Sequence, residues 1–129
     1  MTVLTGHRVV IGVLGSLLLA AAGVIHSQQA ASQTQRFPQF ENDDVKVWKS
    51  IVLPKQPLNM HRHDHPRVII ALKGGTMKIV DQSGAEEQNV WDTGNAYWLP
   101  ANPPGTKHAD VNAGNQPIEV MVVELEKEK

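Results

Sequence analysis

Residues 45–125 form a succession of short apolar and polar runs, each of a length that suits a β-strand. Proline and glycine separate these runs, most densely at Gly74-Gly75 and in residues 100–105. No amphipathic run of helical length with capping residues lies between them. About eight strands are therefore expected, at residues 45–53, 58–63, 67–73, 76–80, 88–91, 96–99, 106–111 and 118–125. Short strands at close spacing without helices predict an all-β sandwich or barrel.

Two runs indicate which strands lie deepest. Residues 67–72 are apolar at nearly every position, which is typical of a central strand. Residues 118–125 alternate incompletely, so this strand is expected to be buried on one side and partly covered on the other. Trp48, Trp91 and Trp98 are predicted to be core or interface residues, with the core as the expected place of Trp98.

The N-terminal segment has the layout of an export signal. The first 40 residues contain neither Asp nor Glu, and His7 and Arg8 precede an apolar run over residues 9–25. This pattern predicts a secretory signal peptide over residues 1–27 and a periplasmic or secreted protein. An uncleaved N-terminal membrane anchor is the alternative, because the run is only slightly shorter than a comfortable membrane span.

The remainder of the chain is predicted to be one domain with flexible flanks. Residues 28–40 are rich in glutamine and poor in apolar side chains, which favours a linker. The folded domain is expected over residues 41–126, followed by a charged tail at 127–129. Because the chain has no cysteine, it has neither disulfides nor thiolate ligands, and its stability must come from a packed core.

Charge and motifs exclude several classes of function. After residue 27 the chain has 11 Lys and Arg against 13 Asp and Glu, which argues against binding to nucleic acid. The sequence contains no Gly-x-Ser-x-Gly motif, phosphate-binding glycine loop or dinucleotide fingerprint. Contact with a membrane is expected only if the N-terminal segment is retained.

Histidines at alternate positions are the main candidates for chemistry. His61, His63 and His65 would share one face of an extended strand, where neighbouring positions lie about 6.6 Å apart. Two such imidazoles can converge on one ion at about 2.1 Å each. The first and third would be about 13 Å apart and cannot share an ion, so either adjacent pair remains a candidate. A purely hydrogen-bonding role is the alternative.

The spacing around these histidines resembles the first motif of the cupin superfamily. That motif has the form His-x-His, three or four residues, Glu, six residues, Gly. Here His61-x-His63 is followed by three residues, Arg67, six residues and Gly74. The likeness fails at one position, because Arg67 stands where family members usually have glutamate.

A second stretch resembles the second cupin motif, which has the form Gly, five residues, Pro-x-Gly, two residues, His, three residues, Asn. Gly94, five residues and Pro100 match its first half. After a three-residue insertion, Pro103-Pro104-Gly105, two residues, His108, three residues and Asn112 match its second half. Both motifs in order, in a strand-rich chain of this length, identify the chain as similar to single-domain cupins.

The resemblance implies a jelly-roll β-barrel with a divalent metal in a pocket at one mouth. By position, His61, His63 and His108 match the family's histidine ligands. Fe, Mn, Zn and Ni are the candidate metals, and their identity stays open because imidazole suits several ions. The substrate is expected to be a small molecule, and Arg67, His65 and Tyr97 are candidates for binding it.

Three outcomes follow from Arg67, since a guanidinium cannot ligate a metal. The metal can be held by three histidines and water, as in some cupin oxygenases, or a neighbouring His65, Asp64 or Asp110 can replace the glutamate. Alternatively, the metal is absent and Arg67 binds an anionic ligand. Arg67 can also point outward and simply pair with Asp64 at the surface.

The functional prediction is therefore an exported single-domain cupin that binds a divalent metal and acts as an oxygenase or isomerase-type enzyme on a small molecule. The alternative is a metal-free cupin that binds or senses a small anion without turnover. The sequence leaves open whether the protein is an enzyme. A homodimer is also predicted, with the long final strand as a contact edge.

Overall fold

The computed structural model describes residues 30–127, which contain nine β-strands and no helix. All strand pairs are antiparallel, and they form two sheets. The larger sheet has the order β1 (Gln35–Glu41), β2 (Val45–Val52), β9 (Ile118–Leu125), β4 (Arg67–Lys73) and β7 (Ala96–Leu99). The smaller sheet has the order β3 (Leu58–His61), β8 (His108–Asn112), β5 (Gly75–Asp81) and β6 (Glu86–Trp91).

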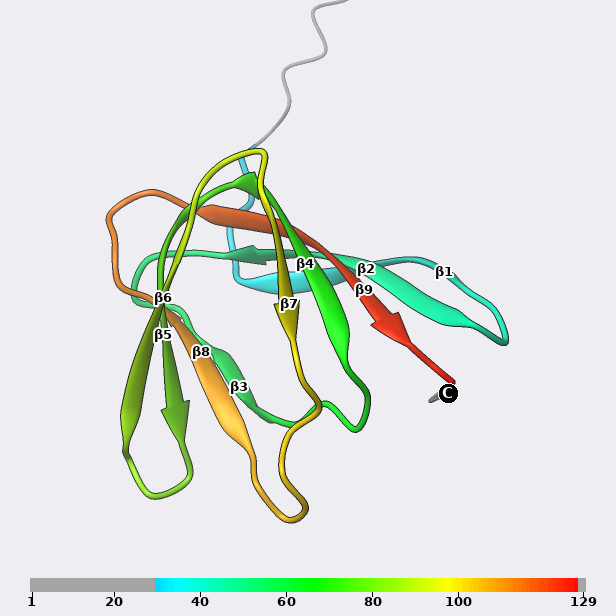
Figure 1. Ribbon diagram of the computed structural model, residues 1–129. Helices are drawn as coiled ribbons and strands as arrows, with labels where there is room; N and C mark the ends of the chain where they lie inside the picture. Colours follow the sequence, from blue (N-terminus) through cyan, green and yellow to red (C-terminus); the bar gives the residue numbers. More distant parts are fainter. Residues whose placement is uncertain (1–29, 128–129) are drawn as a thin grey trace, which may run out of the picture.

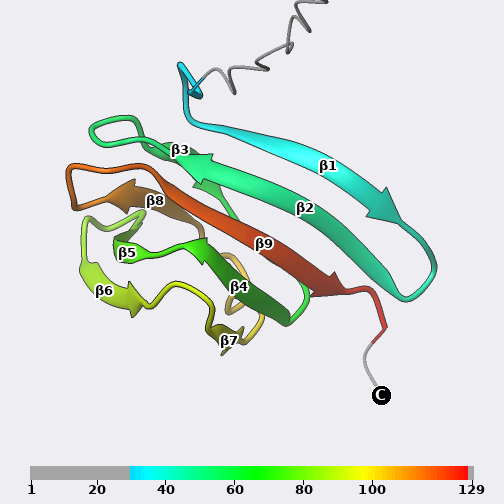
Figure 2. The ribbon, with the colours of Figure 1, turned by 90° about the horizontal axis from the view of Figure 1, so that it is seen from above.

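The two sheets lie against each other as two layers (Figures 1 and 2). The hairpin of β1 and β2, which belongs to the larger sheet, extends beyond the edge of the smaller sheet (Figure 2). The prediction of an all-β architecture is confirmed. No helix long and apolar enough to cross a membrane is present within residues 30–127. The predicted signal peptide or anchor at 1–27 lies outside the described residues.

The core lies between the sheets and follows from the two-residue period of a strand. Alternate positions of β2, β4 and β9 point inward, so the apolar members of these positions are buried. Met77 and Trp91 close the core from the smaller sheet. The hydrophobic cluster between the sheets consists of Trp48, Val52, Ile69, Ala71, Met77, Trp91, Ile118, Val120 and Val122.

The predicted central strand and two of the three tryptophans lie where the sequence pattern placed them. β4 is paired on both sides, by β9 and by β7, as expected for a central strand. Trp48 and Trp91 are in the core, whereas Trp98 is 59% exposed, so its predicted core position is wrong. Side chains alternate between the two faces of a strand, and Tyr97 and Leu99 pack against the core. Trp98, which lies between them on β7, therefore points to the outer face of the larger sheet.

Among the differences from the expected strand boundaries, two concern the region of the histidines and the edge of the larger sheet. Residues 35–40, which the composition assigned to a linker, form most of β1 and pair with β2. This strand needs few apolar residues because it is an edge strand whose side chains are mostly exposed. The strand expected over 58–63 ends at His61, so His63 lies in the following loop.

Two features of the fold position the histidines. β3 and β8 pair so that His61 stands directly opposite His108. The loop after β3 is fastened to the segment after β7 by two hydrogen bonds: the His63 amide donates to Asn102 Oδ1 at 2.7 Å, and the Asn102 amide donates to the His63 carbonyl at 2.8 Å. The two motif segments are thereby held together at one end of the barrel.

Gly74 is required by a close approach between backbones. A Cβ atom at this position would lie 2.0 Å from the Trp91 carbonyl oxygen and 2.9 Å from the Thr93 nitrogen. The Gly74 amide donates to the Thr93 hydroxyl at 2.9 Å. The motif glycine therefore allows the end of β4 to pass directly beside the end of β6.

Candidate metal centre

Three imidazoles from three parts of the chain meet at one point inside the barrel. His61 ends β3, His63 lies in the next loop, and His108 begins β8. Their ring centroids are 4.5 Å apart for His61 and His108, 5.1 Å for His61 and His63, and 5.7 Å for His63 and His108. One nitrogen from each ring lies within 4.8 Å of the others. Such a group can hold a metal ion.

The His61 ring presents a free lone pair. Its Nδ1 lies 2.7 Å from the Asn59 carbonyl oxygen, which only accepts, so Nδ1 carries the proton and donates it. Nε2 is buried and has no hydrogen-bond partner. A buried polar nitrogen without a partner is costly, and coordination to a metal would satisfy it.

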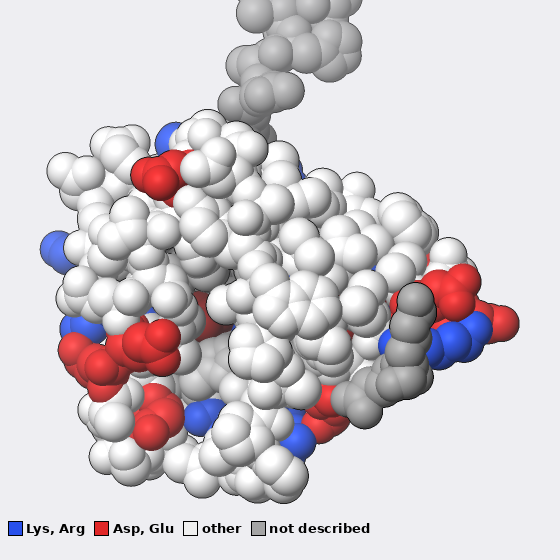
Figure 3. Space-filling view, in the orientation of Figure 1, with Lys and Arg blue, Asp and Glu red and all other residues white. Residues whose placement is uncertain are grey.

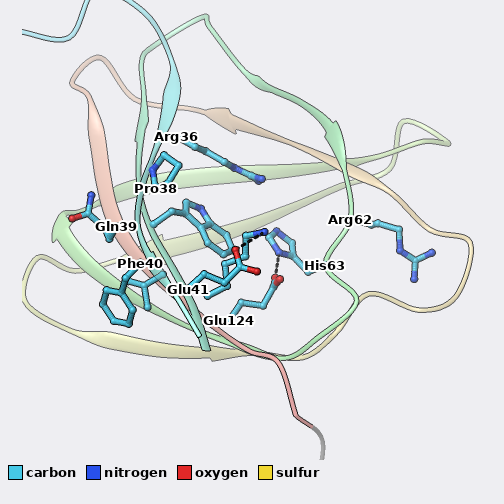
Figure 4. Close-up of a pocket in the computed structure, with 11 residues that line it drawn as sticks. Arg36, Pro38, Gln39, Phe40, Glu41, Arg62, His63 and Glu124 are labelled. Carbon is cyan, nitrogen blue, oxygen red and sulfur yellow. Dashed lines mark hydrogen bonds and ion pairs between the residues drawn. The ribbon is translucent and has the colours of Figure 1, made fainter. Parts of the chain in front are cut away.

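The His63 ring is oriented by a carboxylate. Its Nδ1 donates to Glu124 Oε2 at 2.5 Å, and the two side chains are only 6% and 13% exposed. Figure 4 shows the two side chains facing each other, with the dashed line between them. Burial raises the pKa of Glu124, but the hydrogen bond from His63 and the charge of Arg67 lower it by more. Histidine ligands of metals typically donate their second nitrogen to a carboxylate in this way.

The His108 ring has the opposite tautomer. Asn102 Nδ2 lies 3.2 Å from His108 Nδ1, and because an amide nitrogen only donates, Nδ1 must accept. The proton is then on Nε2, which lies 3.5 Å from Asp110 Oδ1. Two of the three rings thus have an Nε2 lone pair available for a metal, and His108 gains one when its proton moves from Nε2 to Nδ1.

The protonation states suit a metal. Burial, together with the nearby His61, His63 and Arg67, lowers the pKa of His108 to about 4, although Asp110 opposes this shift. Burial also lowers the pKa of His61. Both imidazoles are therefore neutral at pH 7, and neutral imidazole is the form that binds metals.

Arg67 points into the barrel and not to the surface. The residue is 7% exposed, and Nη1 donates to the Pro100 carbonyl oxygen at 3.1 Å. The surface pair with Asp64, the alternative predicted for Arg67, is made instead by Arg62, whose Nη2 lies 2.7 Å from Asp64 Oδ1. Arg67 stands opposite Glu124 in the pairing of β4 with β9. Its charge is thus buried near the histidines and has to be compensated there.

The other predicted binding residues lie elsewhere. His65 Nε2 is 3.9 Å from a Glu126 carboxylate oxygen, and His65 does not join the cluster of three histidines. The Tyr97 hydroxyl accepts from the Asp92 amide at 2.7 Å. Their roles in binding a substrate stay predictions.

Hollows of different sizes adjoin His63 and His108. A pocket of about 390 Å³ is lined by His63, Glu124, Trp48 and Phe40 among others, whereas the Arg62 side chain extends away from the rest (Figure 4). An internal cavity of about 30 Å³ is lined by His63, Arg67 and Asp110 together with core residues. A groove of about 220 Å³ includes His108, Arg67 and Asn102. The surface is visibly hollowed between the β5–β6 part and β7 (Figure 3).

Two residues of the site were not found from the sequence. Val120, Val122 and Glu124 alternate along β9 and therefore share its inward face. The alternation of this strand could thus have predicted that the Glu124 carboxylate points into the fold. Asn102 lies in the three-residue insertion between the halves of the second motif, where no pattern points to it.

Solved structures of cupins superpose on this fold. A cupin domain from Bordetella pertussis superposes with a TM-score of 0.64 at 20% sequence identity, covering 74% of this chain and 95% of that one. An RmlC-like cupin with a double-stranded β-helix fold from Methanocaldococcus jannaschii has a TM-score of 0.58 at 16% identity, covering 76% and 84%. The fold is that of the cupins.

This cupin fold confirms the architecture that the two motifs predicted. A polyketide cyclase from Streptomyces resistomycificus has the same fold, with a TM-score of 0.53, 22% identity and coverage of 74% of this chain and 67% of that one. No protein-family profile matches the sequence, and no curated protein matches it. Likeness at this level of identity establishes the fold and leaves the function to be argued from the site.

Proposed function

We propose that this protein is an exported cupin that binds a divalent transition metal through His61, His63 and His108. The observation that carries the proposal is the buried Nε2 of His61, which has no hydrogen-bond partner and faces a cluster whose nitrogens lie within 4.8 Å of one another. Two of the three rings have their Nδ1 proton held by an acceptor, which directs the Nε2 lone pair toward a shared ion.

The site then suits a metal-dependent reaction of a small molecule. The bound metal, which can be Fe, Mn, Zn or Ni, would polarise an oxygen-bearing group or activate oxygen. Arg67 provides a fixed positive charge beside the histidines, which suits a carboxylate or another anionic group. Trp48 and Phe40 provide an apolar wall in the larger pocket, which suits the remainder of the molecule.

Metal analysis of full-length protein purified without a histidine tag tests this proposal. We expect close to one transition metal ion per chain, and its loss in His61→Ala and in His108→Ala. His65→Ala is the matched control, since His65 lies outside the cluster. Metal content that is the same in all four proteins would contradict the assignment.

A metal-free anion-binding cupin is the second candidate. The observation that favours it is the buried Arg67, which lines both the internal cavity and the groove. In that case a small carboxylate would bind to metal-free protein, and Arg67→Met would abolish binding while His61→Ala would not. Calorimetric titration with a series of carboxylates, in the presence of a chelator, distinguishes the two candidates.

Export and self-association are part of the proposal. Cleavage of the signal peptide is checked by the mass and N-terminal sequence of protein recovered from the periplasm or medium. A homodimer is supported by the outer face of the larger sheet, which is largely uncharged over β4, β7 and β9 (Figure 3). Trp98 is exposed on that face. Sedimentation analysis of wild type and Trp98→Ser tests whether this face joins two copies.

A further inference from the structure

Asp110 lies on the inner face of β8, two residues after His108. Strand periodicity places both side chains on the same side, and Asn112, two residues further, is also buried. In the smaller sheet Asp110 stands opposite Leu58 of β3 and Ile79 of β5. Its side chain is only 15% exposed, and it lines the internal cavity. A carboxylate in such a place needs a partner, because burying it unpaired is costly.

The only ionic partners of Asp110 within 4.0 Å, among residues 30–127, are two of the clustered imidazoles. Oδ2 lies 3.5 Å from His61 Nε2, and Oδ1 lies 3.5 Å from His108 Nε2. Each carboxylate oxygen thus faces an Nε2 atom: that of His61 has a free lone pair, whereas that of His108 has one only after its proton moves to Nδ1. No Lys or Arg nitrogen in the described chain comes within that distance of the carboxylate.

The contact with His61 brings two hydrogen-bond acceptors together. His61 Nδ1 carries the ring proton and donates a hydrogen bond to the Asn59 carbonyl, so Nε2 has only a lone pair. Asp110 Oδ2 is an acceptor as well, and the two atoms lie close together in a buried place. Two buried acceptors at this separation repel unless a cation or proton lies between them. A metal ion supplies that positive charge.

The separations of Asp110 from two of the three imidazoles, one from each carboxylate oxygen, agree with ligands of one ion. With metal–ligand distances of about 2.1 Å, neighbouring ligand atoms of a tetrahedral centre are about 3.4 Å apart. The observed 3.5 Å between Asp110 and each Nε2 is therefore close to what a shared ion requires. Asp110 also contributes the negative charge that three neutral imidazoles lack, and this charge offsets the repulsion between the metal and buried Arg67.

We propose that Asp110 is the fourth protein ligand of the metal, so that the carboxylate comes from β8 instead of from position 67 on β4. This inference rests on the metal-binding function proposed above. The resulting donor set of three imidazoles and one carboxylate is the kind that Zn²⁺, Fe²⁺ and Mn²⁺ accept, and an ion that expands beyond four ligands can also bind water or substrate.

The test uses Co²⁺ as the probe, because its visible absorption reports the number and type of ligands. Full-length wild type, Asp110→Asn and Glu124→Gln are titrated with Co²⁺, and affinity and spectrum are recorded for each. Both variants remove one negative charge from similarly buried side chains, 15% and 13% exposed, but the Glu124 carboxylate bonds to Nδ1 of His63, the ring nitrogen that would not bind the metal. Thermal melts of the metal-free proteins check that each variant folds.

If Asp110 is a ligand, Asp110→Asn lowers the affinity for Co²⁺ at least tenfold and changes the position and intensity of the absorption bands. Glu124→Gln changes the affinity but leaves the band positions as in wild type. An unchanged spectrum in Asp110→Asn would overturn this inference while leaving the three-histidine site intact. No binding of Co²⁺ by wild type would instead overturn the proposed function itself. If Asp110→Asn does not fold, the spectrum of Co²⁺-loaded wild type decides instead. Weak absorption bands, typical of six-coordinate Co²⁺ with mainly water ligands, would then refute the inference.

Discussion

The hydrogen bond between His63 and Glu124 gives the most quantitative prediction. Glu124→Gln keeps an acceptor for His63 Nδ1 but removes the negative charge from a contact of 2.5 Å between side chains 6% and 13% exposed. A hydrogen bond to a charged group contributes about 1.5–3 kcal/mol. Removing the carboxylate partner of a ligating histidine typically weakens metal binding about 10–100-fold, which is the same range of free energy. We therefore expect the dissociation constant for Zn²⁺ to rise about 10–100-fold.

Competition with a chromophoric zinc chelator at pH 7 measures this change. Glu119→Gln is the matched control: it lies on the same strand, but its carboxylate pairs with Lys49 at 3.8 Å and is a third exposed. Such a surface pair contributes little, so zinc affinity should stay within about twofold of wild type. Equal zinc affinities for the two variants would refute the idea that Glu124 orients a metal ligand.

Three further outcomes are expected. Asn102→Asp, which offers His108 Nδ1 an acceptor in place of a donor, should free Nε2 and strengthen zinc binding in the same competition assay; weaker binding would contradict the assigned tautomer. The free energy of unfolding of the metal-free protein should fall by up to about 3 kcal/mol as pH falls from about 6.5 to about 4. In the unfolded chain His108 is protonated at its ordinary pKa, whereas burial lowers its pKa in the folded protein to about 4, so protonation favours the unfolded state in this range. Urea unfolding across this range measures the effect, which His108→Gln should reduce. Gly74→Ala should destabilise the fold by several kcal/mol, because the added Cβ would lie 2.0 Å from the Trp91 carbonyl oxygen. Gly114→Ala, whose Cβ would have its nearest contact at 3.4 Å, should change the melting temperature little. Equal melting temperatures for the two variants would contradict the argument that backbones approach closely at Gly74.

Much of the fold could be predicted because strand periodicity and turn residues are local properties. The runs at 67–73, 96–99 and 118–125 coincide with β4, β7 and β9. β1 could not be recognised, since an edge strand held mainly by backbone pairing with β2 has no apolar pattern of its own.

The site was predictable only in part, because it depends on pairing between distant strands. Spacing brought His61 and His63 into consideration, and the second motif added His108. Their meeting depends on the register that sets His61 opposite His108, which no local pattern specifies. The direction of Arg67 was equally open, and only the fold shows that it points inward.

Anomalous diffraction from crystals of the full-length protein grown with Zn²⁺ tests the metal centre most directly. The account predicts one strong anomalous peak per chain, about 2.1 Å from one ring nitrogen of each of His61, His63 and His108. The absence of a peak at these rings, at a zinc concentration that saturates binding in solution, would contradict it. A peak coordinated by other side chains would contradict it equally.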